Sequence, residues 1–177
     1  MRRLLARDPR LWFSVSANTR APRAGEVHGR DYLFMERDEF ERLRDAGGFL
    51  EWFDVYGDLK GTPRAPVDEH LAAGDDVLLE VDVQGALAVR EAHPDAVLLF
   101  LKAPSRDEQR RRLVERGEDD PEAIERRLAR ADEEEALADR FDAVVVNDDP
   151  DRAADEVAAI LRAHREARPP PAPDSTP

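Results

Sequence analysis

The sequence predicts an α/β fold built around a parallel β-sheet. Three apolar runs rich in β-branched residues have the length and composition of strands buried on both faces. Helical patterns alternate with these runs along the chain, as they do in parallel sheets. The chain has 177 residues, 41% of them hydrophobic, which is enough for one domain with a substantial core. We therefore expect a single domain over residues 1–167, with internal lobes.

Five segments are expected to form strands. The three buried ones are residues 77–83, 96–101 and 143–146, and two shorter ones are 12–16 and 32–34. Five further segments repeat apolar residues at helical spacing or open with capping residues: 38–46, 67–73, 105–115, 121–139 and 151–165. The alternation of these segments supports the parallel sheet.

Two regions depart from this alternation. Residues 17–75 contain turn-rich stretches between shorter elements, which indicates an inserted lobe. Residues 168–177 hold five prolines in ten positions and almost nothing apolar to bury. We expect this last segment to be a disordered Pro-rich tail.

Composition excludes several classes of function. The formal net charge of −13 argues against a nucleic-acid partner. The chain has no cysteine, and its four histidines lie too far apart in sequence to form a metal motif. No apolar run is long enough to span a bilayer, so we expect a cytoplasmic protein without a membrane partner. Oligomeric state has no signal in the sequence.

Two arginines follow the first predicted strand. Arg20 and Arg23 flank Pro22, and Tyr32 follows nine residues later. Guanidinium groups can fork onto phosphate oxygens, and a phenol can donate a further hydrogen bond, so this segment suits one phosphate. Composition alone favours a plainer interpretation, a solvated loop in an arginine-rich chain.

Glu51 follows an apolar pair, Phe49 and Leu50. A carboxylate there could accept two parallel hydrogen bonds from the N1–H and exocyclic amine of guanine, a donor pair that adenine lacks. The alternative is an ordinary exposed glutamate on a strand. Ser16, at a strand end, and Thr62, after a glycine, carry weaker signals of the same kind.

Two carboxylates, Glu80 and Asp82, stand near the end of an otherwise apolar strand. In open α/β sheets that end faces the ligand crevice. Charges in such a place need a partner, such as Mg²⁺-bound water or a nucleotide hydroxyl.

Seven arginines lie on the two helical stretches on either side of residues 115–120: Arg110, Arg111, Arg112, Arg116, Arg126, Arg127 and Arg130. Most are expected to form solvated ion pairs with Glu122, Glu125 and Glu133. A minority could reach ATP phosphates if residues 106–131 act as a lid.

Taken together, these segments resemble bacterial guanylate kinase from about Leu4 to about Arg165. The similarity rests on Ser-Val-Ser-x-x-Thr-Arg-x-Pro-Arg-x-Gly-Glu, Asp-Tyr-x-Phe, Phe-Leu-Glu-Trp, Gly-Thr-Pro, Glu-Val-Asp-Val-Gln-Gly and Val-Asn-Asp-Asp. The resemblance implies a P-loop nucleoside-monophosphate-kinase-like sheet, with residues 17–75 as a GMP-binding lobe and residues 106–131 as a helical lid. It also implies transfer of the ATP γ-phosphoryl group to GMP with Mg²⁺.

The resemblance implies a role for each candidate residue. Arg20, Arg23 and Tyr32 would hold the GMP phosphate, Ser16, Glu51 and Thr62 would read guanine, and Asp82 with Glu80 would line the floor. Arg116 and Arg127 would meet the ATP phosphates, and Asn147 would lie near the adenine. Arg20, Arg116, Arg127 and Asp82 would then support catalysis through charge and positioning.

The sequence departs from the family pattern in two ways. Lys60 stands where relatives usually carry a tyrosine that touches the GMP phosphate. The 177 residues contain no Gly-x-x-x-x-Gly-Lys-Ser/Thr, the loop that in relatives follows the first strand of the sheet and cradles the ATP phosphates. We therefore expect that first strand to be missing and these residues alone to be weakly active or inactive.

Three explanations for the second departure stay open. The complete protein is longer and an ordinary kinase, which the nearly intact GMP-side residues favour. Alternatively, the chain is a non-catalytic module that binds GMP or a phosphorylated ligand. The third explanation is a decayed domain without a present function.

Overall fold

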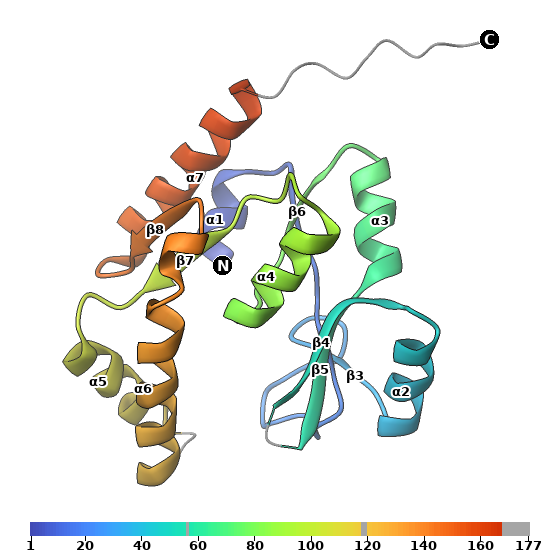
Figure 1. Ribbon diagram of the computed structural model, residues 1–177, viewed down its shortest axis with the longest axis horizontal. Coiled ribbons are helices and arrows are strands. Elements are labelled where there is room, and N and C mark those ends of the chain that lie inside the picture. The colour runs from blue at the N-terminus through green and yellow to red at the C-terminus, as the bar shows by residue number, and fades with distance from the viewer. Residues whose placement is uncertain (56, 118–119, 168–177) are drawn as a thin grey trace. The chain divides into compact units, whose positions relative to one another are not determined.

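The computed structural model describes residues 1–55, 57–117 and 120–167 (Figure 1). The chain divides into two compact units. The first unit comprises Pro9–Leu98 and Asp139–Asp142, and the second comprises Met1–Asp8, Leu99–Ala138 and Ala143–Pro177. The predicted tail lies outside the described residues, and the predicted bounds of the domain, the lobe and the lid stay predictions.

The first unit contains two sheets. In one, β1 (Leu11–Phe13) pairs in parallel with β6 (Asp76–Leu78). The other has the strand order β3-β2-β5-β4, formed by β2 (Ala17–Asn18), β3 (Leu33–Phe34), β4 (Phe49–Val55) and β5 (Asp58–Pro63). β4 and β5 run antiparallel, while β2 and β3 run parallel. The β4–β5 hairpin, absent from the sequence-based prediction, forms the long central ribbon of this unit in Figure 1.

The core of the first unit lies between its mixed sheet and α2 (Arg37–Asp45). Phe40 of α2 is fully buried and stacks on Phe49 of β4, with ring centroids 4.2 Å apart. Ala17 and Leu59 complete the buried cluster. Burial of large apolar side chains such as Phe40 stabilises the fold by about 1.5–3 kcal/mol each, so this cluster anchors the hairpin that carries two predicted site residues, Glu51 and Thr62.

The predicted strand over residues 77–83 is wrong in its second half. β6 ends at Leu78, and α4 (Val83–Ala92) begins where the strand was expected to end. Asp82 is the N-cap of α4, because its Oδ1 accepts a hydrogen bond from the Gly85 amide at 2.9 Å. An apolar run suits a buried strand or a buried helix equally well, and this cap selects the helix. The unit also contains α3 (Arg64–Ala72).

The second unit combines a parallel strand pair with helices. Its elements are α1 (Arg2–Arg7), β7 (Leu99–Lys102), α5 (Arg106–Arg116), α6 (Pro121–Glu135), β8 (Ala143–Val146) and α7 (Pro150–Ala167). β7 pairs with β8, α1 packs on α7, and α5 lies beside α6 (Figure 1). A short 3-10 turn, Ala138–Arg140, follows α6 in the sequence, and its residues from Asp139 on belong to the first unit.

Local signals explain the ends of the α5 and α6 helices. Ser105 and Asp120 cap their N-termini through hydrogen bonds from backbone amides. Gly117 ends α5 with a left-handed φ of 67°, which favours glycine. None of the helices in the described ranges has the length and apolar character needed to cross a membrane.

Candidate functional site

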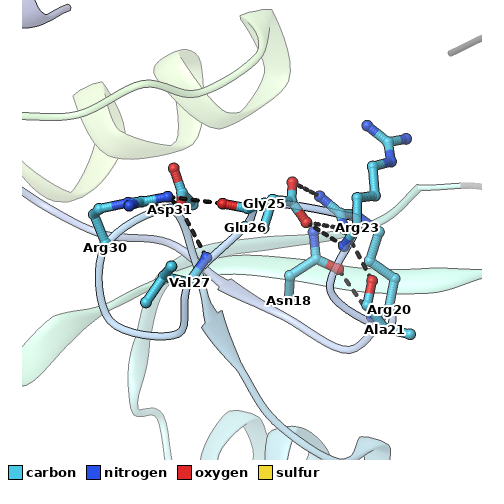
Figure 2. Close-up of polar contacts among 9 residues, drawn as sticks. All are labelled: Asn18, Arg20, Ala21, Arg23, Gly25, Glu26, Val27, Arg30 and Asp31. Carbon is cyan, nitrogen blue, oxygen red and sulfur yellow. Dashed lines mark hydrogen bonds and ion pairs between the residues drawn. The ribbon is translucent and has the colours of Figure 1, made fainter.

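A short loop after β2 holds Arg20 in a defined orientation (Figure 2). Asn18 Oδ1 accepts a hydrogen bond from the Arg20 amide at 3.0 Å and so turns the chain out of the strand. Both terminal nitrogens of Arg20 donate to the carboxylate of Glu26, each at 2.6 Å. The Arg23 amide donates to the same carboxylate at 2.7 Å. Glu26 thus closes the loop around the guanidinium.

The Arg20–Glu26 pair is strongly ionic. Hydrogen bonds from Arg20, and then from the Arg23 amide, lower the pKa of Glu26 to about 2. The Arg20 guanidinium also lies over the rings of Tyr32 and Phe34, at 5.1 and 5.6 Å from their centroids. The guanidinium is therefore oriented by one carboxylate and two aromatic rings.

The second arginine of the motif behaves differently. The Arg23 side chain is exposed and extends away from the Glu26 carboxylate (Figure 2). Its backbone amide joins the hydrogen-bond network around Glu26. Of the three side chains predicted to hold a phosphate, Arg20 and Tyr32 lie against each other, and Arg23 stands at the exposed edge of the loop.

Glu51 and Thr62 form a buried polar pair across the β4–β5 hairpin. The register sets them opposite each other, and Thr62 Oγ1 donates to Glu51 Oε1 at 2.5 Å. Only 8% of Glu51 and 1% of Thr62 is exposed, so the interpretation of Glu51 as an exposed strand residue is wrong. Burial raises the pKa of Glu51, while the Thr62 hydrogen bond and the charge of Lys60 act in the opposite direction.

The second carboxylate oxygen of Glu51 faces the start of α4. A Cβ atom placed on Gly85 would lie 3.3 Å from Glu51 Oε2 and 3.3 Å from Asp82 Oδ1. Glycine at position 85 therefore lets the helix approach both carboxylates closely. Part of the hydrogen-bonding capacity of Asp82 is used in capping α4.

A small pocket of about 80 Å³ lies in the same unit, lined by Phe13, Ser16, Asp31, Tyr32, Lys60 and Glu80. It brings Ser16, Tyr32 and Glu80 together from three separate segments. Lys60, which lines this pocket, lies on β5 two residues before Thr62, so the pocket and the Glu51–Thr62 pair share one strand. The fold thus gathers a fixed guanidinium, a phenol and a buried carboxylate around one region of the first unit.

Comparison with known proteins identifies the family. The sequence profile of guanylate kinase matches residues 2–164. The chain belongs to the guanylate kinase family. The guanylate kinase of Rubrobacter xylanophilus is 53% identical over 154 residues, which cover 87% of this chain and 81% of the relative. A guanylate kinase of Thermus thermophilus is also 53% identical, over 88% of this chain and 71% of the relative.

A solved structure supports the same conclusion. The crystal structure of guanylate kinase from Anaplasma phagocytophilum superposes with a TM-score of 0.77 at 36% identity, covering 92% of this chain and 78% of that one. The α/β fold expected for a guanylate kinase is therefore confirmed.

The residues that guanylate kinase resemblance assigns to ATP lie in the second unit. Arg116 is the last residue of α5 and is exposed, and Arg127 is half-buried on α6. Asn147 follows β8, and its amide donates to the Lys102 carbonyl at 2.8 Å. Within the described residues, Asn147 Oδ1 is buried without a hydrogen-bond partner. A buried acceptor without a donor destabilises the fold unless water or a ligand supplies the hydrogen bond.

The other arginines of α5 and α6 form surface ion pairs, only some of them with the predicted glutamates. Arg110 pairs with Glu125 across the two helices, and Arg111 bonds to Glu108 and Glu115 on its own helix. Arg126 pairs with Glu122, as expected, and Arg130 pairs with Glu134. No group of three or more histidine, aspartate or glutamate side chains that could hold a metal ion occurs in the part of the chain that the structure describes.

Two residues near the predicted site were missed by sequence reasoning. Glu26 orients Arg20, and Asn18 turns the chain toward it. The signal for Glu26 was present, because an acidic residue follows both arginines within a tight, glycine-containing turn.

Proposed function

We propose that this protein transfers the γ-phosphoryl group of ATP to GMP, giving GDP and ADP. One observation of this molecule carries the proposal, beside its family membership. A single compact unit combines an oriented guanidinium, Arg20 against Tyr32, with a buried carboxylate, Glu51. These groups have the chemistry needed for the two ends of GMP, its phosphate and its guanine.

Guanine recognition rests on Glu51 in this proposal. Its carboxylate accepts hydrogen bonds from the N1–H and the exocyclic amine of guanine, while adenine offers an unprotonated ring nitrogen at the same position. Thr62 donates to one of the two carboxylate oxygens, Oε1, and Ser16 adds a hydroxyl. Binding of AMP would leave the buried carboxylate without donors from the base, a mismatch that strongly disfavours adenine.

Phosphate recognition rests on Arg20, Arg23 and Tyr32. Glu26 and the Ala21 carbonyl take only part of the five N–H donors of Arg20, so others can serve a phosphate. Glu26 also removes the need to order the guanidinium when the ligand binds. Arg23 supplies a second cation from the loop edge.

Catalysis in this proposal depends on charge and position, without a covalent intermediate. Arg116 and Arg127 would meet the ATP phosphates, and Asn147 Oδ1 would accept a hydrogen bond from the adenine amine. Mg²⁺ carried by ATP would neutralise charge on the transferred group. Glu80 and Asp82 are the carboxylates suited to accept hydrogen bonds from metal-bound water or a nucleotide hydroxyl.

Calorimetric titration with GMP and AMP, beside an assay of ADP formation, tests the proposal. GMP should bind at least about 100-fold more tightly than AMP, because adenine leaves the buried Glu51 carboxylate without donors from the base. The 177 residues contain no phosphate-binding loop of the Gly-x-x-x-x-Gly-Lys type, so we expect slow turnover from them alone. Equal affinity for both nucleotides, or no binding of GMP, would contradict the proposal. GMP binding without any turnover by a chain that carries such a loop would instead indicate a binding module.

A further inference from the structure

Thr19 follows β2 and is hydrogen-bonded to β5, directly before the loop that holds Arg20. Its amide donates to the Leu59 carbonyl at 3.0 Å, and its side-chain Oγ1 accepts a hydrogen bond from the Leu59 amide at 2.8 Å. In a regular antiparallel ladder, two residues that face each other in this way exchange both bonds through their backbones. At Thr19 the side-chain hydroxyl therefore takes the place of the backbone carbonyl.

Leu59 is a fixed anchor for this contact. It is 3% exposed and belongs to the buried cluster at the core of the first unit. Buried amides almost always have a hydrogen-bond partner, so the Leu59 amide needs an acceptor on this side of β5. The hydroxyl of Thr19 supplies that acceptor, and the carbonyl of Thr19 does not have to face β5.

The direction of the Thr19 carbonyl sets the peptide plane that leads into Arg20, because a carbonyl and the amide that follows it belong to one planar group. The Arg20 amide, at the other end of this plane, donates to Asn18 Oδ1 at 3.0 Å (Figure 2). From this plane the Arg20 guanidinium reaches the Glu26 carboxylate and lies over the Tyr32 ring. The side chains of Asn18 and Thr19 thus hold the peptide from which Arg20 extends.

We propose that Thr19 is a positioning residue for Arg20. The inference rests on the proposed function, in which Arg20 binds the phosphate of GMP. Thr19 acts on the phosphate through the backbone of Arg20, without a contact of its own. When the hydroxyl is removed, the Leu59 amide takes the carbonyl of residue 19 as its acceptor. The peptide then turns toward β5, and the guanidinium leaves the orientation that Glu26 and Tyr32 support.

Calorimetry with GMP and with guanosine, which lacks the phosphate, tests this role on the unaltered chain, Thr19→Val and Thr19→Ser. Valine keeps the shape of threonine and removes the acceptor, whereas serine keeps the hydroxyl. Thr19→Val should weaken GMP binding about 10-fold and leave guanosine binding within about 2-fold. Thr19→Ser should bind GMP within about 2-fold of the unaltered chain, because the hydrogen bond is kept.

A double-mutant cycle tests whether Thr19 acts through Arg20. In the Arg20→Met background, Thr19→Val should change GMP affinity by less than about 2-fold, since no guanidinium is left to orient. A merely structural role of Thr19 gives the same loss in both backgrounds.

Asp54→Ala is the matched control, because it also removes a side-chain acceptor of one backbone amide in the first unit. Asp54 Oδ1 accepts a hydrogen bond from the Gly57 amide at 2.7 Å, near the turn between β4 and β5. This variant should bind GMP within about 2-fold of the unaltered chain. If Thr19→Val unfolds, Thr19→Cys replaces it, because a thiol is similar in size to a hydroxyl and only a weak acceptor.

Unchanged GMP affinity in the folded valine or cysteine variant overturns the inference. So does an equal loss for GMP and guanosine, an undiminished loss in the Arg20→Met background, or an equal loss in Asp54→Ala. In each case, GMP binding by the unaltered chain leaves the proposed function standing. Failure of the unaltered chain to bind GMP overturns both.

Discussion

The loop around Arg20 and the surface of α5 both contain arginine–glutamate ion pairs, but the two pairs have different surroundings. Arginine hydrogen bonds lower the pKa of Glu26 and of Glu108 to about 2 in both places. The Arg20 side chain is 17% exposed and packs on two aromatic rings, whereas that of Arg111, which holds Glu108, is 56% exposed. The pKa of the glutamate falls to about the same value in both pairs. Only the Arg20–Glu26 pair is packed against aromatic side chains.

The difference indicates that orientation, more than charge, separates the proposed binding arginine, Arg20, from the surface arginines of α5. Exposed pairs three or four residues apart on a helix contribute little, because solvent and salt screen them. Glu26 already holds the Arg20 side chain in one orientation, so ligand binding loses little further side-chain entropy there. A simple count of arginines would have pointed to α5 and α6 as the anion-binding segments, ahead of the loop that carries Arg20.

The largest expected effect is the loss of Arg20. Arg20→Met should weaken GMP binding about 100-fold, because it removes a charge-assisted fork and leaves Glu26 facing the phosphate. Arg111→Met is the control from α5, and should alter neither GMP affinity nor the melting temperature by more than about 1 °C. Calorimetry and thermal melting measure both. A change under 3-fold in Arg20→Met would remove Arg20 from the site.

Glu51→Gln should separate recognition from stability. We expect the preference for GMP over AMP to fall at least about 10-fold, because the amide offers one acceptor in place of two. Discrimination that is unchanged in competitive binding assays would exclude Glu51 as the base reader.

The same variant should be more stable at neutral pH. Burial raises the pKa of Glu51, so its contribution to stability is present below the pKa of the unfolded chain and is lost as the pH rises through the folded value. A neutral amide avoids that loss, and the melting temperature at pH 7 should rise by about 2 °C. A lower melting temperature would show that the carboxylate stabilises the hairpin.

Thr62→Val tests the buried partner of Glu51. Removal of the hydroxyl leaves Glu51 Oε1 without its donor, and the free energy of unfolding should fall by about 1–2 kcal/mol. Thr62→Ser keeps the donor and should recover most of the loss. Chemical denaturation of both variants gives the difference. Equal stability of the two would mean that lost packing, rather than the hydrogen bond, explains the effect.

The smallest effect should separate Glu26, in the Arg20 loop, from Glu108, on α5. Both have lowered folded pKa values, so their contribution to stability is present above the ordinary pKa near 4.5 and is lost as pH falls toward about 2. Carboxyl titration by NMR should give both a midpoint near 2. Only Glu26→Gln should weaken GMP binding, by about 5-fold, while Glu108→Gln should not. Equal effects on GMP would erase the distinction between the two regions.

The sequence by itself determined the elements that local patterns encode. Periodicity predicted the parallel strands and most helices, and the residues Ser105, Asp120 and Gly117 mark helix ends through bonds to their near neighbours. The motifs also identified the family, because they preserve residue types in a fixed order. The helix α4 and the β4–β5 hairpin were missed, since their apolar and polar residues fit more than one period.

The tertiary structure alone decided which polar residues are buried and what they contact. The sequence left Glu51 open between a base reader and an exposed strand glutamate, and only the fold shows that Thr62, eleven residues away, and α4 at Gly85 enclose it. Likewise, only the folded chain shows that Lys60 and Arg20 both lie over the ring of Tyr32. Burial and the electrostatics that follow from it depend on contacts between distant segments, and no local pattern of residues contains that information.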